Sequence, residues 1–161
     1  MLKKTVAVCI LSLALLAGCT RTSSRDQSVA ADFTLQDLNG RMVKLSDYKG
    51  RVILLDFWAT WCPPCVASVP GIEKLHKTYQ DRGLVVLAVS MDDGGWDSVK
   101  SFIAQNGVSY TVLKGTEAVS TDYQVRTIPL MIIVGKDGRI AKRYLGYGND
   151  EDMEREIKAI L

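Results

Sequence analysis

The sequence predicts an α/β domain in which helices cover a central mixed β-sheet. Two apolar runs, RVILLDFWA at 51–59 and GLVVLAVSM at 83–91, have the continuous hydrophobicity of strands that are buried on both faces. A helix-like segment follows each run, so the two strands are expected to pair in parallel through crossover helices. Two later strand-like runs flank Lys136-Asp137-Gly138, which predicts an antiparallel hairpin at one end of the sheet.

Shorter patterns predict the remaining elements. Residues 33–45 alternate around Asn39-Gly40, a pair that favours a tight hairpin turn. Apolar residues at helical spacing predict the helices, and Gly107 is a stop signal for the second of them. In chain order, the expected elements are a hairpin at 33–45, helices at 63–80 and 95–105, a short strand at 110–113, a helical turn at 117–123 and a last helix capped by Asp150.

Composition indicates one globular domain, expected at residues 33–161. The chain has 161 residues, 47% of them hydrophobic, and no internal repeat, so it can bury a sizeable core. Its formal net charge is +2, and Lys and Arg are scattered among Asp and Glu instead of forming a basic stripe. This pattern argues against nucleic acid as a partner.

Residues 1–18 have the pattern of an export signal. Lys3 and Lys4 form a short positive region, and residues 5–17 form an apolar stretch that is too short for a lasting transmembrane helix. The stretch ends in LAGC, which resembles the lipobox of bacterial lipoproteins and implies a lipid on Cys19. The alternative is an ordinary signal peptide in which this cysteine occurs by chance.

Residues 19–32 are small and polar, and we expect them to act as a flexible tether after the lipidated cysteine. The leader and tether together predict a protein that is exported and lipid-anchored to the bacterial cell envelope. Its domain would face the periplasm or another extracytoplasmic space, where disulfides persist.

Cysteine usage leaves one dithiol in the exported form. Cys9 lies in the signal and Cys19 would carry lipid, so Cys62 and Cys65 remain as thiols. Both belong to WATWCPPC, at the expected junction of a strand and a helix. Unpaired N–H groups and the positive helix end favour a thiolate at Cys62, and the thiolate is the form that attacks disulfides.

The spacing of the pair suits disulfide exchange. Cys65 lies one helical turn after Cys62 and can attack a mixed disulfide formed there. Pro63 and Pro64 occupy the first helical turn, where their missing N–H groups break no helical hydrogen bond.

Other uses of the cysteine pair fit less well. Zinc needs four ligands, whereas the exported chain offers two thiols and His76, which we expect on the surface of the helix. Covalent haem attachment needs a histidine directly after the second cysteine, where Val66 stands. A purely structural disulfide would close too short a loop to stabilise the fold much. We expect no metal and no cofactor.

Several stretches together resemble thioredoxin: DFWATWCPPC, the proline five residues after Cys65, and TIPLMIIVGKDGRI at 127–140. The preceding FTLQDLNGRMVKLSDYKGRVILLDFWATWC and the strand and helix material at 86–105 resemble its exported, membrane-anchored TlpA/ResA branch. The resemblance covers about residue 32 to the C-terminus. It implies a thioredoxin-like fold, a central mixed β-sheet flanked by helices, with an N-terminal β-hairpin and an inserted strand-helix unit.

The resemblance also implies roles for individual residues. Cys62 would be the exposed nucleophile, Cys65 the buried resolving thiol, and Pro129 a cis-proline opposite the disulfide. The residues expected to contact substrate are Trp61, Pro63, Pro64, Thr127 and Ile128.

Asp56 is an acidic residue in the middle of an apolar strand, where a carboxylate is costly without a function or a partner. It matches the family's buried carboxylate, which accepts or relays the proton of the resolving thiol. Burial should raise its pKa toward the working range of a general base. The alternative is that its side chain faces solvent. Many TlpA/ResA-like sequences have a basic and an acidic residue where this chain has Val66 and Ser68, so we expect a more apolar rim around the dithiol.

These observations predict a lipid-anchored thiol-disulfide oxidoreductase that reduces disulfides of exported proteins, including apocytochrome c. Its partners would be exported proteins with disulfides or dithiols and a membrane thiol-disulfide electron donor. One alternative is a peroxiredoxin-like peroxidase, which is disfavoured because only Thr60 of its usual Pro and Thr precedes Cys62. Another is a copper-binding or delivery module, which is disfavoured because no histidine or methionine cluster accompanies the thiols.

Overall fold

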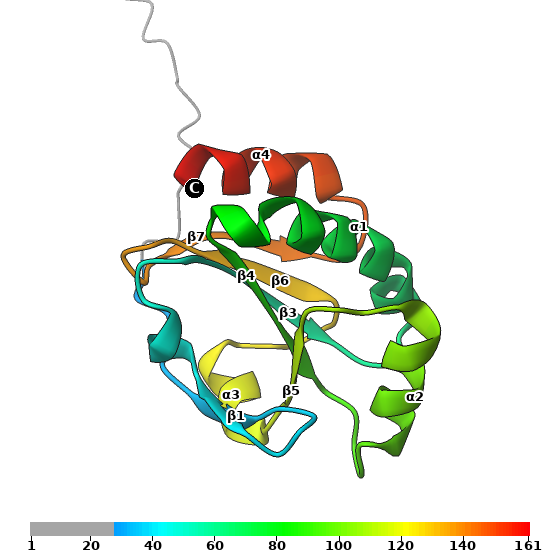
Figure 1. Ribbon diagram of the computed structural model, residues 1–161. Coiled ribbons are helices and arrows are strands. Elements are labelled where there is room, and N and C mark those ends of the chain that lie inside the picture. The colour runs from blue at the N-terminus through cyan, green and yellow to red at the C-terminus, as the bar shows by residue number, and fades with distance from the viewer. Residues whose placement is uncertain (1–27) are drawn as a thin grey trace, which may run out of the picture.

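A five-stranded mixed sheet forms the centre of the computed structural model, which describes residues 28–161 (Figure 1). The strand order is β5-β4-β3-β6-β7, with β3 in the middle. β3 is parallel to β4 and β4 to β5, whereas β6 is antiparallel to both β3 and β7. The strands are β3 (Val52–Trp58), β4 (Leu84–Ser90), β5 (Thr111–Lys114), β6 (Leu130–Val134) and β7 (Ile140–Leu145).

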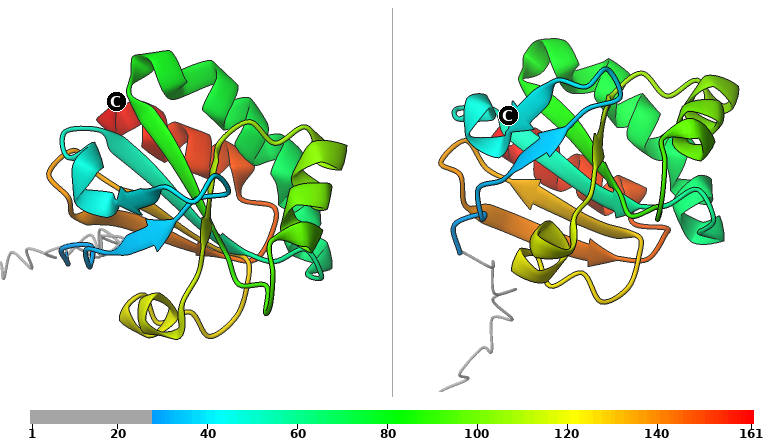
Figure 2. Two further views of the ribbon diagram at one scale, coloured as in Figure 1. Left: turned by 60° about the horizontal axis from the view of Figure 1, so that its bottom comes forward. Right: turned by 90° about the horizontal axis from the view of Figure 1, so that it is seen from below.

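Different elements cover the two faces of the sheet. Helices α1 (Pro63–Tyr79) and α4 (Asp150–Ile160) lie side by side on one face, and α2 (Asp97–Asn106) packs beside them. The opposite face carries α3 (Glu117–Asp122) and a separate hairpin of β1 (Thr34–Gln36) and β2 (Met42–Lys44), as Figure 2 shows. Short 3₁₀ turns at Leu45–Tyr48 and Gln80–Arg82 follow β2 and α1.

The central strand supplies both cores because successive strand residues point to opposite faces. Leu54 and Trp58 belong to the core beneath α1, whereas Ile53, Leu55 and Phe57 belong to the core beneath α3 and the hairpin. All seven residues of β3 are buried, as expected from their continuous apolar run. The strand therefore ends in a fully enclosed environment, directly before the cysteine pair.

The structure confirms the predicted mixed sheet, the hairpin and the order of helices, with limits shifted by one or two residues. One detail is wrong: Asn149, not Asp150, occupies the N-cap position of α4, and its side chain makes no cap hydrogen bond. Asp150 is instead the first helical residue, where it adds negative charge beside the positive helix end.

The predicted signal at 1–18, Cys19 and residues 20–27 of the predicted tether lie outside the described residues. Residues 28–32, the end of that range, are attached to the domain and not free: Val29 forms a β-bridge with Arg139, and the N–H of the buried Ala30 donates to the Gly138 carbonyl at 2.9 Å. Within 28–161, no helix has the length and hydrophobicity needed to cross a membrane.

Candidate functional site

The site is built where β3 runs into α1. Cys62 occupies the N-cap position of α1, and Pro63 and Pro64 form its first turn as predicted. Cys62 and Cys65 are joined by a disulfide, and the Cys65 backbone N–H donates to Cys62 Sγ at 3.3 Å. A sulfur therefore takes the place that a Ser or Asp oxygen usually fills at a helix start. Partial positive charge at this end favours a negative sulfur.

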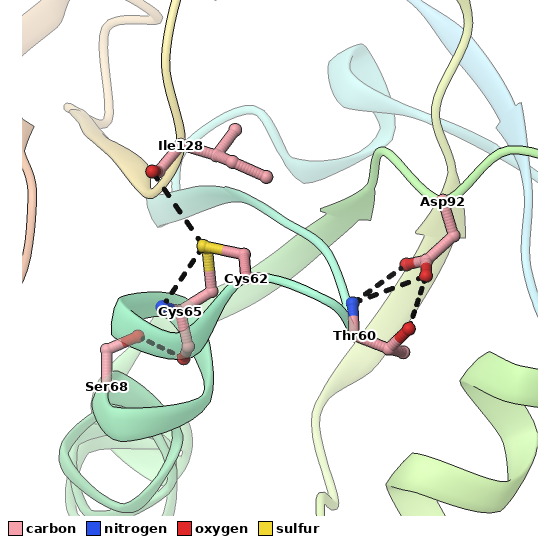
Figure 3. Close-up of a disulfide and its surroundings, with 6 residues drawn as sticks. All are labelled: Thr60, Cys62, Cys65, Ser68, Asp92 and Ile128. Atoms are coloured by element: carbon pink, nitrogen blue, oxygen red, sulfur yellow. Dashed lines mark hydrogen bonds between the residues drawn. A yellow bond between two sulfur atoms is a disulfide. The ribbon is translucent and has the colours of Figure 1, made fainter.

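Both sulfurs are buried in the oxidised protein, with Cys62 4% exposed and Cys65 1% exposed. The expectation of an exposed Cys62 is therefore wrong for this oxidation state. Two contacts explain the burial: Cys62 caps α1, and the Ile128 carbonyl oxygen lies 3.8 Å from its Sγ (Figure 3). Oxidised sulfur carries no proton, so this contact can become a hydrogen bond only after reduction to the thiol.

The segment opposite the disulfide contains the predicted proline. The Ile128–Pro129 peptide bond is cis, and Pro129 is buried, whereas Thr127 is exposed. The Gly146 N–H donates to the Pro129 carbonyl at 3.0 Å, which joins the loop after β7 to this segment. The cysteine pair thus faces the backbone of Ile128 and Pro129, which the Gly146 hydrogen bond ties to the loop after β7.

The two tryptophans of the motif have different surroundings. Trp61 is 65% exposed beside the disulfide, whereas Trp58 is buried and packs against Phe102 of α2, with ring centroids 5.1 Å apart and the ring planes tilted by 46°. Pro63 and Pro64 are exposed, as a surface that contacts a substrate requires. Trp61 and the two prolines therefore border the disulfide, and Trp58 anchors the loop to the core.

Asp56 is 2% exposed, which excludes the alternative of a solvent-facing side chain. It lies between Leu54 and Trp58 on the α1 side of the sheet, in the core that also contains Cys65. Its Oδ1 atom is buried and has no hydrogen-bond partner among the described residues. Burial raises the pKa of this carboxyl to about 7, because the protein interior disfavours its charged form.

Asp92, which follows β4, is a site residue that the sequence pattern did not predict. Its carboxylate accepts hydrogen bonds from the Thr60 N–H at 3.1 Å, the Thr60 hydroxyl at 2.5 Å and the Ser90 hydroxyl at 2.9 Å. Figure 3 shows the contact with Thr60 beside the disulfide. Asp92 thereby holds the loop between β3 and α1 against the loop after β4. An acidic residue just after a buried strand was the available signal, but it did not identify Thr60 as the partner.

Ser68 does not lie on the rim of the dithiol, contrary to expectation. It is fully buried, and its hydroxyl donates to the Cys65 carbonyl at 2.7 Å. Val66 and Ser68 are the two positions that differ from many TlpA/ResA-like sequences, and of these only Val66 is partly exposed. The helical spacing explains the difference, because position 68 turns inward with Cys65, one turn before it.

His76 is half-buried rather than at the surface, because its ring packs edge-on against Tyr110 with centroids 6.0 Å apart. It lies three helical turns from Cys65 and is no part of the dithiol site. Among residues 28–161, no group of three or more Cys, His, Asp or Glu side chains is placed to hold a metal ion.

Several known proteins are similar to this chain in sequence. The model of the family named Redoxin matches residues 25–161. The thiol-disulfide oxidoreductase ResA of Bacillus anthracis is 32% identical over 133 residues, 81% of this chain and 76% of that protein. ResA of Geobacillus kaustophilus is 34% identical over 134 residues, 83% of this chain and 76% of that protein.

Solved structures of two bacterial proteins have a similar fold. The thioredoxin domain of a thiol-disulfide oxidoreductase from Bacteroides vulgatus is 28% identical, with a TM-score of 0.76 and coverage of 86% of this chain and 100% of that one. A Chlorobium tepidum protein provisionally named thiol:disulfide interchange protein DsbE is 33% identical, with a TM-score of 0.79 and coverage of 84% and 96%.

Asp56 should make the stability of the oxidised protein depend on pH. Its pKa is about 7 in the folded chain and about 3.9 in an unfolded one, so the folded state binds the extra proton between these values. The stability contribution of Asp56 is therefore fully present below about pH 4 and is lost as pH rises through 7. Asp56→Asn stays neutral throughout. As pH rises from about 4 to above 7, its free energy of unfolding should therefore increase relative to that of the wild type by up to about 4 kcal/mol.

Denaturant unfolding of the oxidised proteins between pH 4 and pH 8 measures this difference. Asp93→Asn, a change at an exposed neighbour of Asp92, is the control and should follow the wild-type profile. Parallel profiles for wild type and Asp56→Asn would mean that the buried carboxyl keeps an ordinary pKa.

Asp92→Ala should loosen the loop before the cysteine pair. The substitution removes the acceptor of three hydrogen bonds, so we expect a loss of about 1–3 kcal/mol in the free energy of unfolding. Hydrogen exchange at the Thr60 amide should also become faster. Asp93→Ala should change stability by less than about 0.5 kcal/mol. Equal stability of the two variants, with Thr60 equally protected, would contradict the role of Asp92.

Proposed function

Because the chain belongs to the Redoxin family and is a thiol-disulfide oxidoreductase, we propose that it reduces disulfides of exported proteins at a membrane surface. The observation that carries the proposal is the Cys62–Cys65 disulfide at the start of α1, opposite the Ile128–Pro129 segment.

The reaction begins with the reduced protein. The Cys62 thiolate attacks one sulfur of a client disulfide, so a Cys62–client disulfide forms and the other client sulfur leaves as a thiolate. The Cys65 sulfur, after losing its proton, then attacks Cys62 Sγ. The Cys62–Cys65 disulfide forms and the second client thiolate leaves. Two electrons pass to the client, both client thiolates are protonated, and the protein is left oxidised.

The environment of each sulfur favours a different role. Cys62 Sγ accepts the Cys65 N–H and caps the helix, a contact that would stabilise a thiolate and supports Cys62 as the proposed nucleophile. Cys65 lies on the buried side of α1, where no residue within 28–161 gives its sulfur a comparable hydrogen bond, so it needs a base. Asp56, on the same side of the sheet and with a pKa near 7, is the group that we propose takes the Cys65 proton.

Client binding would use the backbone on the other side of the disulfide. Thr127 is exposed and Ile128 touches the Cys62 sulfur, so an extended client segment can pair with this edge and bring its disulfide to Cys62. Trp61, Pro63 and Pro64 supply exposed apolar surface next to it. Pro129 supports the edge from within the fold.

The proposed location rests on the leader sequence rather than on the domain. The lipobox-like LAGC supports lipidation of Cys19 and an extracytoplasmic domain on a tether. In an oxidising compartment a reductant must itself be reduced again, so we propose a membrane thiol-disulfide electron donor as its partner. Apocytochrome c is one proposed client, because its haem-binding cysteines must be reduced before attachment.

Reduction of insulin disulfides tests the roles of the cysteines. Cys62→Ser removes the attacking sulfur and should lower turnover to the uncatalysed rate. Cys65→Ser keeps the attack but removes resolution, so mixed disulfides between Cys62 and the client should accumulate on non-reducing gels. Turnover by Cys62→Ser, or a Cys65→Ser protein that never forms mixed disulfides, would contradict the assignment.

Fractionation of cells tests the anchor. Cys19→Ser removes the thiol that would carry the lipid, so the protein should leave the membrane fraction and lose labelling by radioactive palmitate. Cys9→Ser, inside the predicted signal, is a matched control and should remain membrane-bound and labelled. Membrane retention and labelling of both variants alike would refute lipidation at Cys19.

A further inference from the structure

A groove lies directly beside the edge that is proposed to bind clients. Its volume is about 620 Å³, within the range of ordinary binding pockets, and Thr127 forms part of its wall. Thr127 precedes Ile128, whose carbonyl lies 3.8 Å from Cys62 Sγ. A segment that occupied this groove would therefore continue along the same edge that leads to the disulfide.

Both apolar and basic residues line the groove. Leu130 is buried beneath it, and Leu145, paired with Leu130 across the sheet, is 66% exposed. Arg126 and Arg143 also line it, and its lining contains no acidic residue from the described part of the chain. Charge and shape here suit a chain segment that carries a carboxylate next to an apolar side chain.

The two arginines differ in how they are held. The Arg143 guanidinium donates to the Tyr123 carbonyl at 3.1 Å, which fixes positive charge beside the groove. Arg126 is exposed and, within residues 28–161, makes no ion pair. Its guanidinium is therefore available to a carboxylate that arrives with a client, and such pairs are strengthened by hydrogen bonds from the guanidinium.

Further exposed apolar residues lie at the end of the sheet that carries the disulfide. The large exposed apolar residues of the described chain include Trp61, beside Cys62, and Leu145 and Tyr147, which flank Gly146. The Gly146 N–H bonds to the Pro129 carbonyl, so these two residues lie at the same end of the sheet as the cysteines. Exposed aromatic and apolar residues around a polar contact are typical of an interaction surface.

We propose that this groove selects clients with an acidic residue close to the disulfide that is reduced. An extended segment paired with Thr127 and Ile128 advances about 3.3 Å per residue, so a side chain within roughly three residues of the client cysteine reaches Arg126. The pairing guides the client by charge, and the exchange itself still belongs to Cys62 and Cys65. This inference rests on the proposed reduction of protein disulfides and names the class of client.

The test uses the full reduced chain and three synthetic peptides. Each peptide is closed by the same internal disulfide, which is flanked on both sides by glutamates, by glutamines or by lysines. At low ionic strength the second-order rate constant should be about threefold higher for the glutamate peptide than for the glutamine peptide, and lowest for the lysine peptide. The preference should shrink at high salt, because exposed charges are screened.

Variants assign the preference to the groove. Arg126→Gln should abolish most of the difference between glutamate and glutamine peptides, and Arg126→Lys should keep part of it. Lys49→Gln makes the same change in net charge before the start of β3, at the other end of that strand from the cysteines, and should leave the preference intact. All three variants should reduce the uncharged bis(2-hydroxyethyl) disulfide at the wild-type rate, which shows that the exchange chemistry is preserved.

The outcomes separate this inference from the proposed function. Equal rates for the three peptides, or a preference that Arg126→Gln leaves unchanged, would overturn the acidic-client proposal while the reductase activity stands. Failure to reduce both the peptides and the small disulfide would overturn the reductase proposal itself, and this inference with it.

Discussion

The chemistry depends on a sulfur that caps a helix. Because β3 runs into α1 with only a short loop between them, Cys62 arrives at the N-cap position and its Sγ accepts the Cys65 N–H. The Cys65 N–H lies in the first turn of the helix and has no acceptor within the helix, so it is free to stabilise a thiolate at Cys62. The prolines at the next two positions start the helix without breaking an intrahelical hydrogen bond, and they offer no N–H group of their own to the sulfur.

A second constraint is the burial of Asp56 in the central strand. An isolated carboxyl in an apolar core costs stability, and the protein lessens this cost by keeping the group protonated up to about pH 7. The same burial makes Asp56 able to exchange a proton near neutral pH, on the face of the sheet that contains Cys65. Stability and proposed function are therefore opposed at this position, as often happens at active sites.

Contacts between distant segments complete the site. Asp92 holds Thr60, the Ile128 carbonyl covers the Cys62 sulfur, and Gly146 supports Pro129. Each contact joins loops at the same end of the sheet, where β3 and β4 end and β6 begins. The contacts therefore join the loops around the buried sulfurs, and Thr127, which is exposed next to Ile128, lines the same groove as Arg126.

The sequence by itself determined the strands, the helices and the position of the cysteine pair, because hydrophobic periodicity and proline placement act locally. Asp56 was also recognisable, since a carboxyl group within an apolar run is too costly to bury unless it has a partner or a function. Only the tertiary structure decided the burial of Cys62, the Asp92–Thr60 contact, the inward position of Ser68 and the basic groove. These features depend on which loops meet at one end of the sheet, and residues far apart in the chain carry no local pattern that records such a meeting.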